Sequence, residues 1–104
     1  MIKSFVVILK NKRKEALTDD LLNMHVKYVK QLYKEGVLKL CGPFTDNDGA
    51  LMIFNCHTNE DVQHFLANDP FIKEKYYGTY EVTEFIEAND ENNWLLDIPQ
   101  TQKT

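Results

Sequence analysis

Two residues, one in each half of the chain, have side chains suited to proton transfer. His25 lies among apolar residues at helical spacing, and Asp69 stands directly before Pro70. Imidazole exchanges protons near neutral pH. A nearby carboxylate holds the ring in one tautomer and supports its action as a general base. The pair therefore indicates acid–base chemistry if the fold brings the two side chains together, which their spacing alone does not establish.

Each residue also has a purely structural interpretation. A lone histidine on the apolar face of a helix can be a core residue whose ring nitrogens are satisfied, and an aspartate before proline is a common helix cap. Cys56, His57 and His64 do not form a tetrahedral ligand set, so no metal is expected. The sequence has no phosphate-binding glycine loop and no Gly-x-Ser-x-Gly motif, and we expect no cofactor.

The helix that carries His25 is the clearest element in the sequence. Thr18 is a typical N-cap, Asp19 and Asp20 suit the positive end of the helix dipole, and Gly36 is the expected stop. The apolar face that includes His25 also contains Leu21, Leu22, Tyr28, Val29 and Leu32. This pattern points the imidazole from the helix toward a sheet.

The residues around Asp69 predict a break between two helices. Thr58 opens a helix that ends near Asn68. Asp69 then caps a short turn whose first position is Pro70. The second helix is expected to bury Val62, Phe65 and Leu66. If it packs beside the first helix, Asp69 lies near the face that carries His25.

Four segments have the pattern of strands: 2–10, 37–41, 50–54 and 79–86. The first and third are apolar at nearly every position, which predicts central strands covered on both faces. The second contains Lys39 and the fourth alternates, which predicts edge strands. Gly42-Pro43 and Asp46-Asn47-Asp48-Gly49 predict a hairpin turn between the second and third strands. That turn sets Cys41 opposite Ile53 and Cys56 opposite Leu38, out of register for a disulfide.

The order of elements, βαββαβ, predicts an α+β ferredoxin-like fold with a four-stranded antiparallel sheet and both helices on one face. We place the first and third strands at the centre, side by side and parallel. The other sheet face would then leave apolar residues such as Val6 and Ile8 in water. Because such a patch is unusual on a monomer, we expect a homodimer that joins two sheet faces.

The bulk composition limits the possible partners. The chain has 104 residues and a formal charge of −4, which argues against binding to nucleic acid or to an anionic membrane. No apolar run is long enough to span a membrane, and we expect a cytoplasmic protein with reduced cysteines. Residues 1–87 form the predicted domain, and 88–104 form an acidic tail. In that tail, Trp94, Leu95 and Leu96 are expected to dock on the body or on a partner, and residues 99–104 are expected to be disordered.

Several motifs together resemble the YciI-like, or YCII-related, domain family over roughly residues 1 to 87. The most specific are His25 in the first helix, the Gly42-Pro43 before the hairpin loop and the Asp69-Pro70-Phe71 run. The others are Phe5-Val6-Val7-Ile8-Leu9, Tyr28, Gly36, Leu40-Cys41, Asp48-Gly49-Ala50, Ile53-Phe54, Asn68 and Tyr80-Glu81-Val82 leading to Phe85.

The resemblance implies a dimeric α+β barrel whose shared histidine and aspartate, here His25 and Asp69, form the presumed active site. Relatives include a dehydrochlorinase of a chlorinated hydroxyquinol, muconolactone isomerases and cofactor-free monooxygenases. It therefore implies a cofactor-independent enzyme acting on a small, cyclic or phenolic molecule. The alternative is a binding or regulatory dimer without turnover. In either case the expected substrate-binding residues are Gly42, Pro43, Phe44, Phe71 and Tyr80, with Tyr76 a further candidate.

Overall fold

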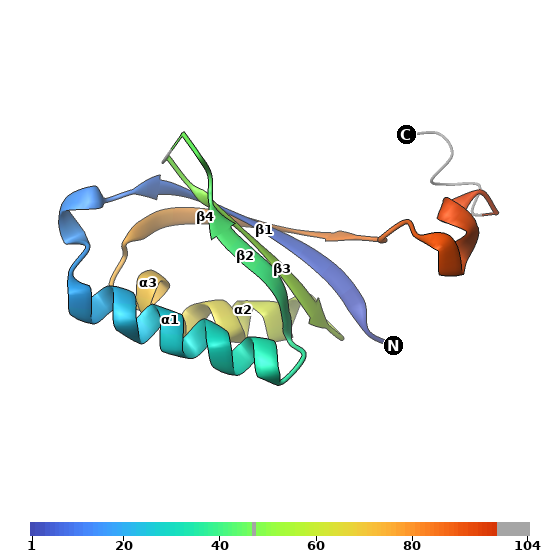
Figure 1. The fold of residues 1–104 in the computed structure, drawn as a ribbon, viewed down its shortest axis with the longest axis horizontal. Coiled ribbons are helices and arrows are strands. Elements are labelled where there is room, and N and C mark those ends of the chain that lie inside the picture. Colours follow the sequence, from blue (N-terminus) through green and yellow to red (C-terminus); the bar gives the residue numbers. More distant parts are fainter. Residues whose placement is uncertain (47, 98–104) are drawn as a thin grey trace.

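A four-stranded sheet with helices on one face makes up the body of the protein (Figure 1). The structure, a computed structural model, describes residues 1–46 and 48–97. Its elements in chain order are β1 (Lys3–Lys12), α1 (Asp19–Lys34), β2 (Leu38–Pro43), β3 (Ala50–Cys56), α2 (Asn59–Ala67), α3 (Pro70–Lys73) and β4 (Tyr77–Phe85). Two short 3-10 helices, η1 (Lys14–Ala16) and η2 (Asp90–Leu95), complete the set. This is the ferredoxin-like α+β fold that the sequence predicts.

The two central strands are the ones that the sequence predicts, but they do not run in the predicted relative direction. The strand order is β2-β3-β1-β4, so β1 and β3 lie side by side as expected. They run antiparallel, with Val6 paired to Ile53, and the prediction of a parallel pair was wrong. The reason is topological. The crossover through α1 makes β2 parallel to β1 with one strand between them, and the β2–β3 hairpin then reverses β3.

An irregularity at Lys39 changes the predicted register of the cysteines. The pairing of β2 with β3 shifts between Leu38 and Leu40, so Cys41 pairs with Met52 instead of Ile53. Cys56 pairs with Lys3 on the far side of β3, whereas the sequence placed it opposite Leu38. Both cysteines are free thiols, as expected. A bulge of this kind inserts one residue and turns the following side chains to the other face, which brings Cys41 to the helix side of the sheet.

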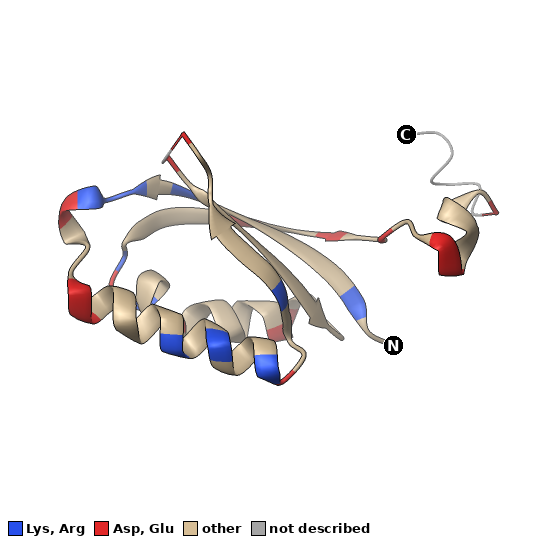
Figure 2. Cartoon of the chain, viewed as in Figure 1, with Lys and Arg blue, Asp and Glu red and all other residues tan. Residues whose placement is uncertain are grey.

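The ends of α1 are set by the residues that the sequence indicated. The hydroxyl of Thr18 accepts a hydrogen bond from the Leu21 N–H at 3.0 Å. Gly36 has a φ of 77°, a left-handed conformation that favours glycine. Acidic residues occupy the first turn and lysines follow toward the other end (Figure 2). This distribution matches the helix dipole.

Alternate residues of the central strands form the core. Phe5, Val7, Met52 and Phe54 are buried beneath the helices. Their neighbours point the other way and are only partly covered. We call Val6, Ile8, Leu40, Leu51 and Ile53 the outer sheet face. The helices α1, α2 and α3 all lie on the opposite side (Figure 1), so no helix within residues 1–46 and 48–97 covers the outer sheet face.

Residues 88–97 continue from β4 away from the body (Figure 1). Trp94 and Leu96 are 59% and 61% exposed, so the expected docking on the body is not observed. The Trp94 indole N–H instead donates to Asp90 within η2. The prediction of disorder for 99–104 lies outside the described residues. Docking of the tail on a partner stays a prediction.

Gly49 lies where the hairpin returns to the sheet, and it has no room for a side chain. A Cβ there would lie 2.4 Å from the Leu9 carbonyl oxygen. We expect Gly49→Ala to lower the free energy of unfolding by about 1–3 kcal/mol because the backbone of β1 or of the hairpin must shift. Urea unfolding measures this. Gly42→Ala is the matched control, since its Cβ meets nothing within 4 Å, and equal losses in the two variants would contradict the prediction.

Candidate active site

His25 and Asp69 are in direct contact. The His25 Nδ1 lies 2.8 Å from the Asp69 Oδ1, and the two side chains are 14% and 2% exposed. A carboxylate oxygen accepts, so Nδ1 carries the proton and Nε2 is the ring nitrogen left for a ligand. In this arrangement the carboxylate can orient the imidazole and stabilise the imidazolium that forms when Nε2 takes up a proton.

Asp69 is also a helix cap, so both interpretations of this residue apply. Its Oδ1 accepts the N–H of Phe71 at 2.9 Å and begins α3 with Pro70 at the first position. The Phe71 ring stacks on His25, with centroids 3.7 Å apart and planes within 7°. The Asp-Pro-Phe run therefore fixes the imidazole both by a hydrogen bond and by stacking.

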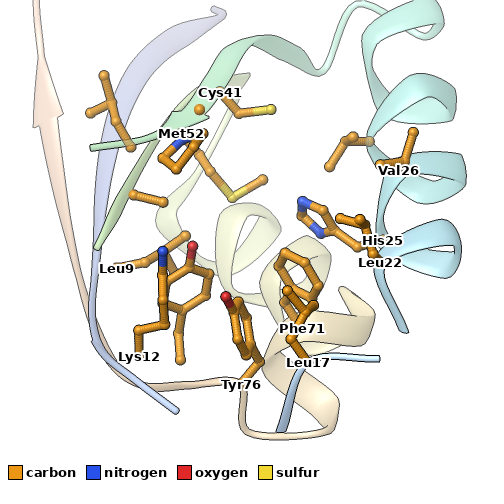
Figure 3. A pocket seen from close by; sticks show the side chains of 16 residues that line it. Leu9, Lys12, Leu17, Leu22, His25, Val26, Cys41, Met52, Phe71 and Tyr76 are labelled. Atoms are coloured by element: carbon orange, nitrogen blue, oxygen red, sulfur yellow. The ribbon is translucent and has the colours of Figure 1, made fainter. Parts of the chain in front are cut away.

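The imidazole lines a pocket between α1 and the sheet (Figure 3). The pocket has a volume of about 430 Å³, within the range of small-molecule sites. Most of its walls are apolar, and they come from β1, α1, β2, β3, α3 and the start of β4. A small ligand in this space would meet the edge of His25 while Asp69 stays buried behind it.

The structure brings some of the predicted substrate-binding residues together and separates others. Gly42, Pro43 and Phe71 line the pocket with His25, and Tyr76 lies there too. Tyr80 does not line it. Its hydroxyl donates to the Gln63 side chain on α2, farther along the sheet. Phe44 also lies outside the lining and packs against the hairpin near Gly49. We therefore leave Tyr80 and Phe44 out of the proposed site.

Other ionisable groups around the site are held in their protonated forms. Burial raises the pKa of Tyr77 to about 12, and the negative charge of Asp69 adds to this effect. Burial and Asp69 also raise the pKa of the Cys41 thiol. Burial likewise raises the pKa of Tyr28 to about 12, and its hydroxyl donates to the Phe65 carbonyl. These tyrosines and the thiol thus stay neutral near pH 7, which leaves His25 as the group suited to proton transfer.

Sequence reasoning missed Lys12 and Cys41, which both line the pocket. Cys41 was missed because the bulge in β2 was not predicted. The sequence predicts that the first strand ends at Lys10 and that the basic residues 10–14 form a solvated loop rather than an anion site, so it does not place Lys12 in the pocket. The signal that could have found Lys12 is Asn11, a residue that tolerates positive φ and has a φ of 58° here.

The described residues contain neither a candidate metal cluster nor a candidate membrane helix. No group of three or more His, Cys, Asp or Glu side chains among them is placed to hold a metal ion. None of the helices within 1–46 and 48–97 is both long and apolar enough to cross a bilayer.

Residues 4–86 match the model of the YCII-related domain. The chain belongs to the YCII-related domain family. No curated protein matches it. The matched residues end at 86, directly after β4.

Solved structures support the same fold for this YCII-related protein. The 5-chloro-2-hydroxyhydroquinone dehydrochlorinase of Burkholderia phenoliruptrix AC1100, in complex with 2,5-dihydroxybenzoquinone, aligns with a TM-score of 0.66 at 21% identity over 86% of this chain and 99% of its own. Rv0793 from Mycobacterium tuberculosis aligns with a TM-score of 0.53 at 8% identity over 86% and 98% of the two chains. At these identities the likeness shows the fold alone.

Proposed function

We propose that this YCII-related protein is a cofactor-independent enzyme that moves a proton on a small ring molecule, with His25 as the general base or acid. The observation that carries the proposal is the His25–Asp69 hydrogen bond at the wall of an otherwise apolar pocket. A purely structural histidine would not need an open cavity beside its ring.

The proposed chemistry uses only side chains present in the chain. Nε2 of His25 accepts a proton from an acidic O–H or C–H of the bound molecule, and Asp69 stabilises the resulting imidazolium. The stacked Phe71 keeps the ring from rotating away. Return of the proton to another atom gives isomerisation, and loss of a leaving group such as chloride gives elimination. Both outcomes balance without an oxidant.

A dehydrochlorinase among the similar structures is consistent with this class of reaction. That enzyme was solved with a hydroxylated quinone bound, which supports testing flat, oxygenated rings here. At 21% identity the roles of residues in that enzyme cannot be transferred to this chain, so the proposal depends on the geometry of His25 and Asp69.

We also propose that two copies join through the outer sheet face. The row Leu40, Ile53 and Val6 crosses three neighbouring strands and has no covering element within the described chain. A second copy would remove this apolar surface from water, which is the main favourable contribution to most protein association. The pocket lies on the opposite, helix side of the sheet, so both sites of the dimer would stay open.

Proton exchange provides the test of the proposed function. A panel of cyclic ketones, dihydric phenols and chlorinated hydroxyquinols is incubated with the protein in D₂O and followed by ¹H NMR. We expect wild type to accelerate loss of a ring proton, or release of chloride, for at least one compound. We expect His25→Gln to lose that acceleration by about 100-fold or more.

The controls separate an enzyme from a binding module. His64→Gln removes a histidine from the exposed side of α2 and should leave the rates unchanged. If compounds bind in the pocket but their proton exchange is no faster, the protein is a non-catalytic binding or regulatory dimer and not an enzyme. Equal rates for His25→Gln and wild type would exclude His25 as the proton-transfer group.

A further inference from the structure

The pocket has a second charged position, away from His25. Among the described residues that line it, Lys12 is the one lysine or arginine, and none is an aspartate or glutamate. Figure 3 shows Lys12 on the sheet side of the pocket and His25 on the opposite side, where it projects from α1. The lining therefore presents a cation to a ligand that already touches the imidazole.

The backbone at Asn11 places Lys12 in the pocket. Phe5, Val7 and Leu9 face the helices, so regular alternation would send Lys12 to the opposite face. Asn11 has a φ of 58°, and its side chain donates to the Thr79 hydroxyl at 2.8 Å. This left-handed residue breaks the alternation. The opposed strand is altered at the same place, since Tyr77, the partner of Lys12, is buried in the pocket wall.

Two tyrosine rings lie close to the ammonium group. The Lys12 Nζ lies 5.9 Å from the Tyr76 ring centroid and 5.8 Å from that of Tyr77. Both rings are buried, and burial raises the pKa of Tyr76 as it does that of Tyr77. Their hydroxyls thus stay protonated and can donate hydrogen bonds near neutral pH. Cation–π contact with the rings also keeps the lysine stem along this wall.

We propose that Lys12 binds an anionic oxygen, a carboxylate or phenolate, carried by the ring molecule on which His25 acts. The inference deepens the proposed function by naming the charge of its substrate, and it rests on that function for the role of His25. The apolar walls take the ring, Lys12 takes the charge, and the acidic proton faces Nε2. Burial of an anion in such a cavity is costly without a partner, and Lys12 is that partner.

The placement also suits the chemistry at His25. Removal of a proton from a ring acid leaves more negative charge on the ring oxygens. A lysine at the far wall stabilises that charge as it develops, which is the electrostatic contribution that accelerates such steps. Lys12 would therefore serve both selection of the substrate and the reaction itself.

Matched acids and amides test the proposal by binding alone. The probes are benzoate with benzamide and salicylate with salicylamide, each titrated by NMR into wild type, Lys12→Met, Lys12→Arg and His25→Gln. We expect wild type to bind the acids more tightly than the amides, and Lys12→Met to weaken the acids by about tenfold to a hundredfold. Lys12→Arg should restore most of the preference. Binding of the amides should be the same in wild type and Lys12→Met, which shows that the pocket is intact.

The outcomes distinguish this inference from the proposed function. If no acid binds wild type more tightly than its amide, or if Lys12→Met keeps the preference, the anion site is wrong. If wild type prefers the acids but the exchange test shows no turnover, the anion site at Lys12 is supported and the proposed enzymatic function is wrong. Loss of turnover in His25→Gln with an unchanged acid preference supports both assignments. Acid binding that weakens with added salt in wild type but not in Lys12→Met provides an independent check.

Discussion

Asp69→Asn is expected to slow proton transfer at His25 by about 10²- to 10⁴-fold while the fold persists. Asparagine is nearly the same size and caps helices as well as aspartate does, so the Phe71 N–H keeps its acceptor. The amide carries no charge, however, and it cannot stabilise an imidazolium. The rate is measured as proton exchange or chloride release, with the compound that responds best in the panel.

The comparison with Asp69→Ala separates the two roles of this residue. Alanine removes the acceptor of both the His25 Nδ1–H and the Phe71 N–H in a site that is 1% exposed. We expect it to lower the free energy of unfolding by about 2–4 kcal/mol, and Asp69→Asn by about 1 kcal/mol or less. Wild-type turnover in Asp69→Asn would mean that Asp69 is only a helix cap.

The helices and the central strands could be predicted because local residues determine them. Thr18 and Thr58 cap α1 and α2 through their hydroxyls, and Asp69 caps α3, as their types and positions indicate. The apolar runs in β1 and β3 predict burial on both faces. The outer faces of these strands are only partly covered in the single chain, and that difference is the basis for expecting a dimer.

What could not be predicted depends on single residues that interrupt a regular strand. The shift at Lys39 moved Cys41 to a different partner, and the left-handed Asn11 turned Lys12 toward the pocket. Alternation and pairing put Tyr80 on the same face as its partner Leu9, but alternation alone cannot tell where along that face it lies. Tyr80 reaches α2 and Gln63, whereas Tyr76 and Tyr77 reach the pocket. Periodicity predicts on which face of the sheet a side chain lies. Its contacts along that face depend on how the helices pack there.

The contact between His25 and Asp69 lies between these cases. Each residue could be chosen from its type and neighbours, and the fold placed both on the helix side. Their 2.8 Å separation depends on how α3 packs against α1, which includes the stacking of Phe71 on the imidazole. No spacing in the sequence encodes that distance, because the two residues come from helices that meet only in the folded chain.

Ile53→Glu is expected to convert a dimer into a monomer. Ile53 is the middle residue of the row Leu40, Ile53 and Val6, because it pairs with Val6 on one side and with Leu40 on the other. In a face-to-face dimer a glutamate there would be buried without a partner, so we expect the dimer dissociation constant to rise by about a thousandfold or more. In the single chain the same side chain faces water, so the circular dichroism spectrum should stay that of wild type. Sedimentation at micromolar concentration measures the mass, with Asn23→Glu on the exposed side of α1 as the control for added charge.

Because the outer sheet face and the pocket lie on opposite sides of the sheet, the Ile53→Glu monomer should still bind ligands beside His25. A wild type with the mass of one chain, or a variant that stays dimeric, would show that this face does not join two copies.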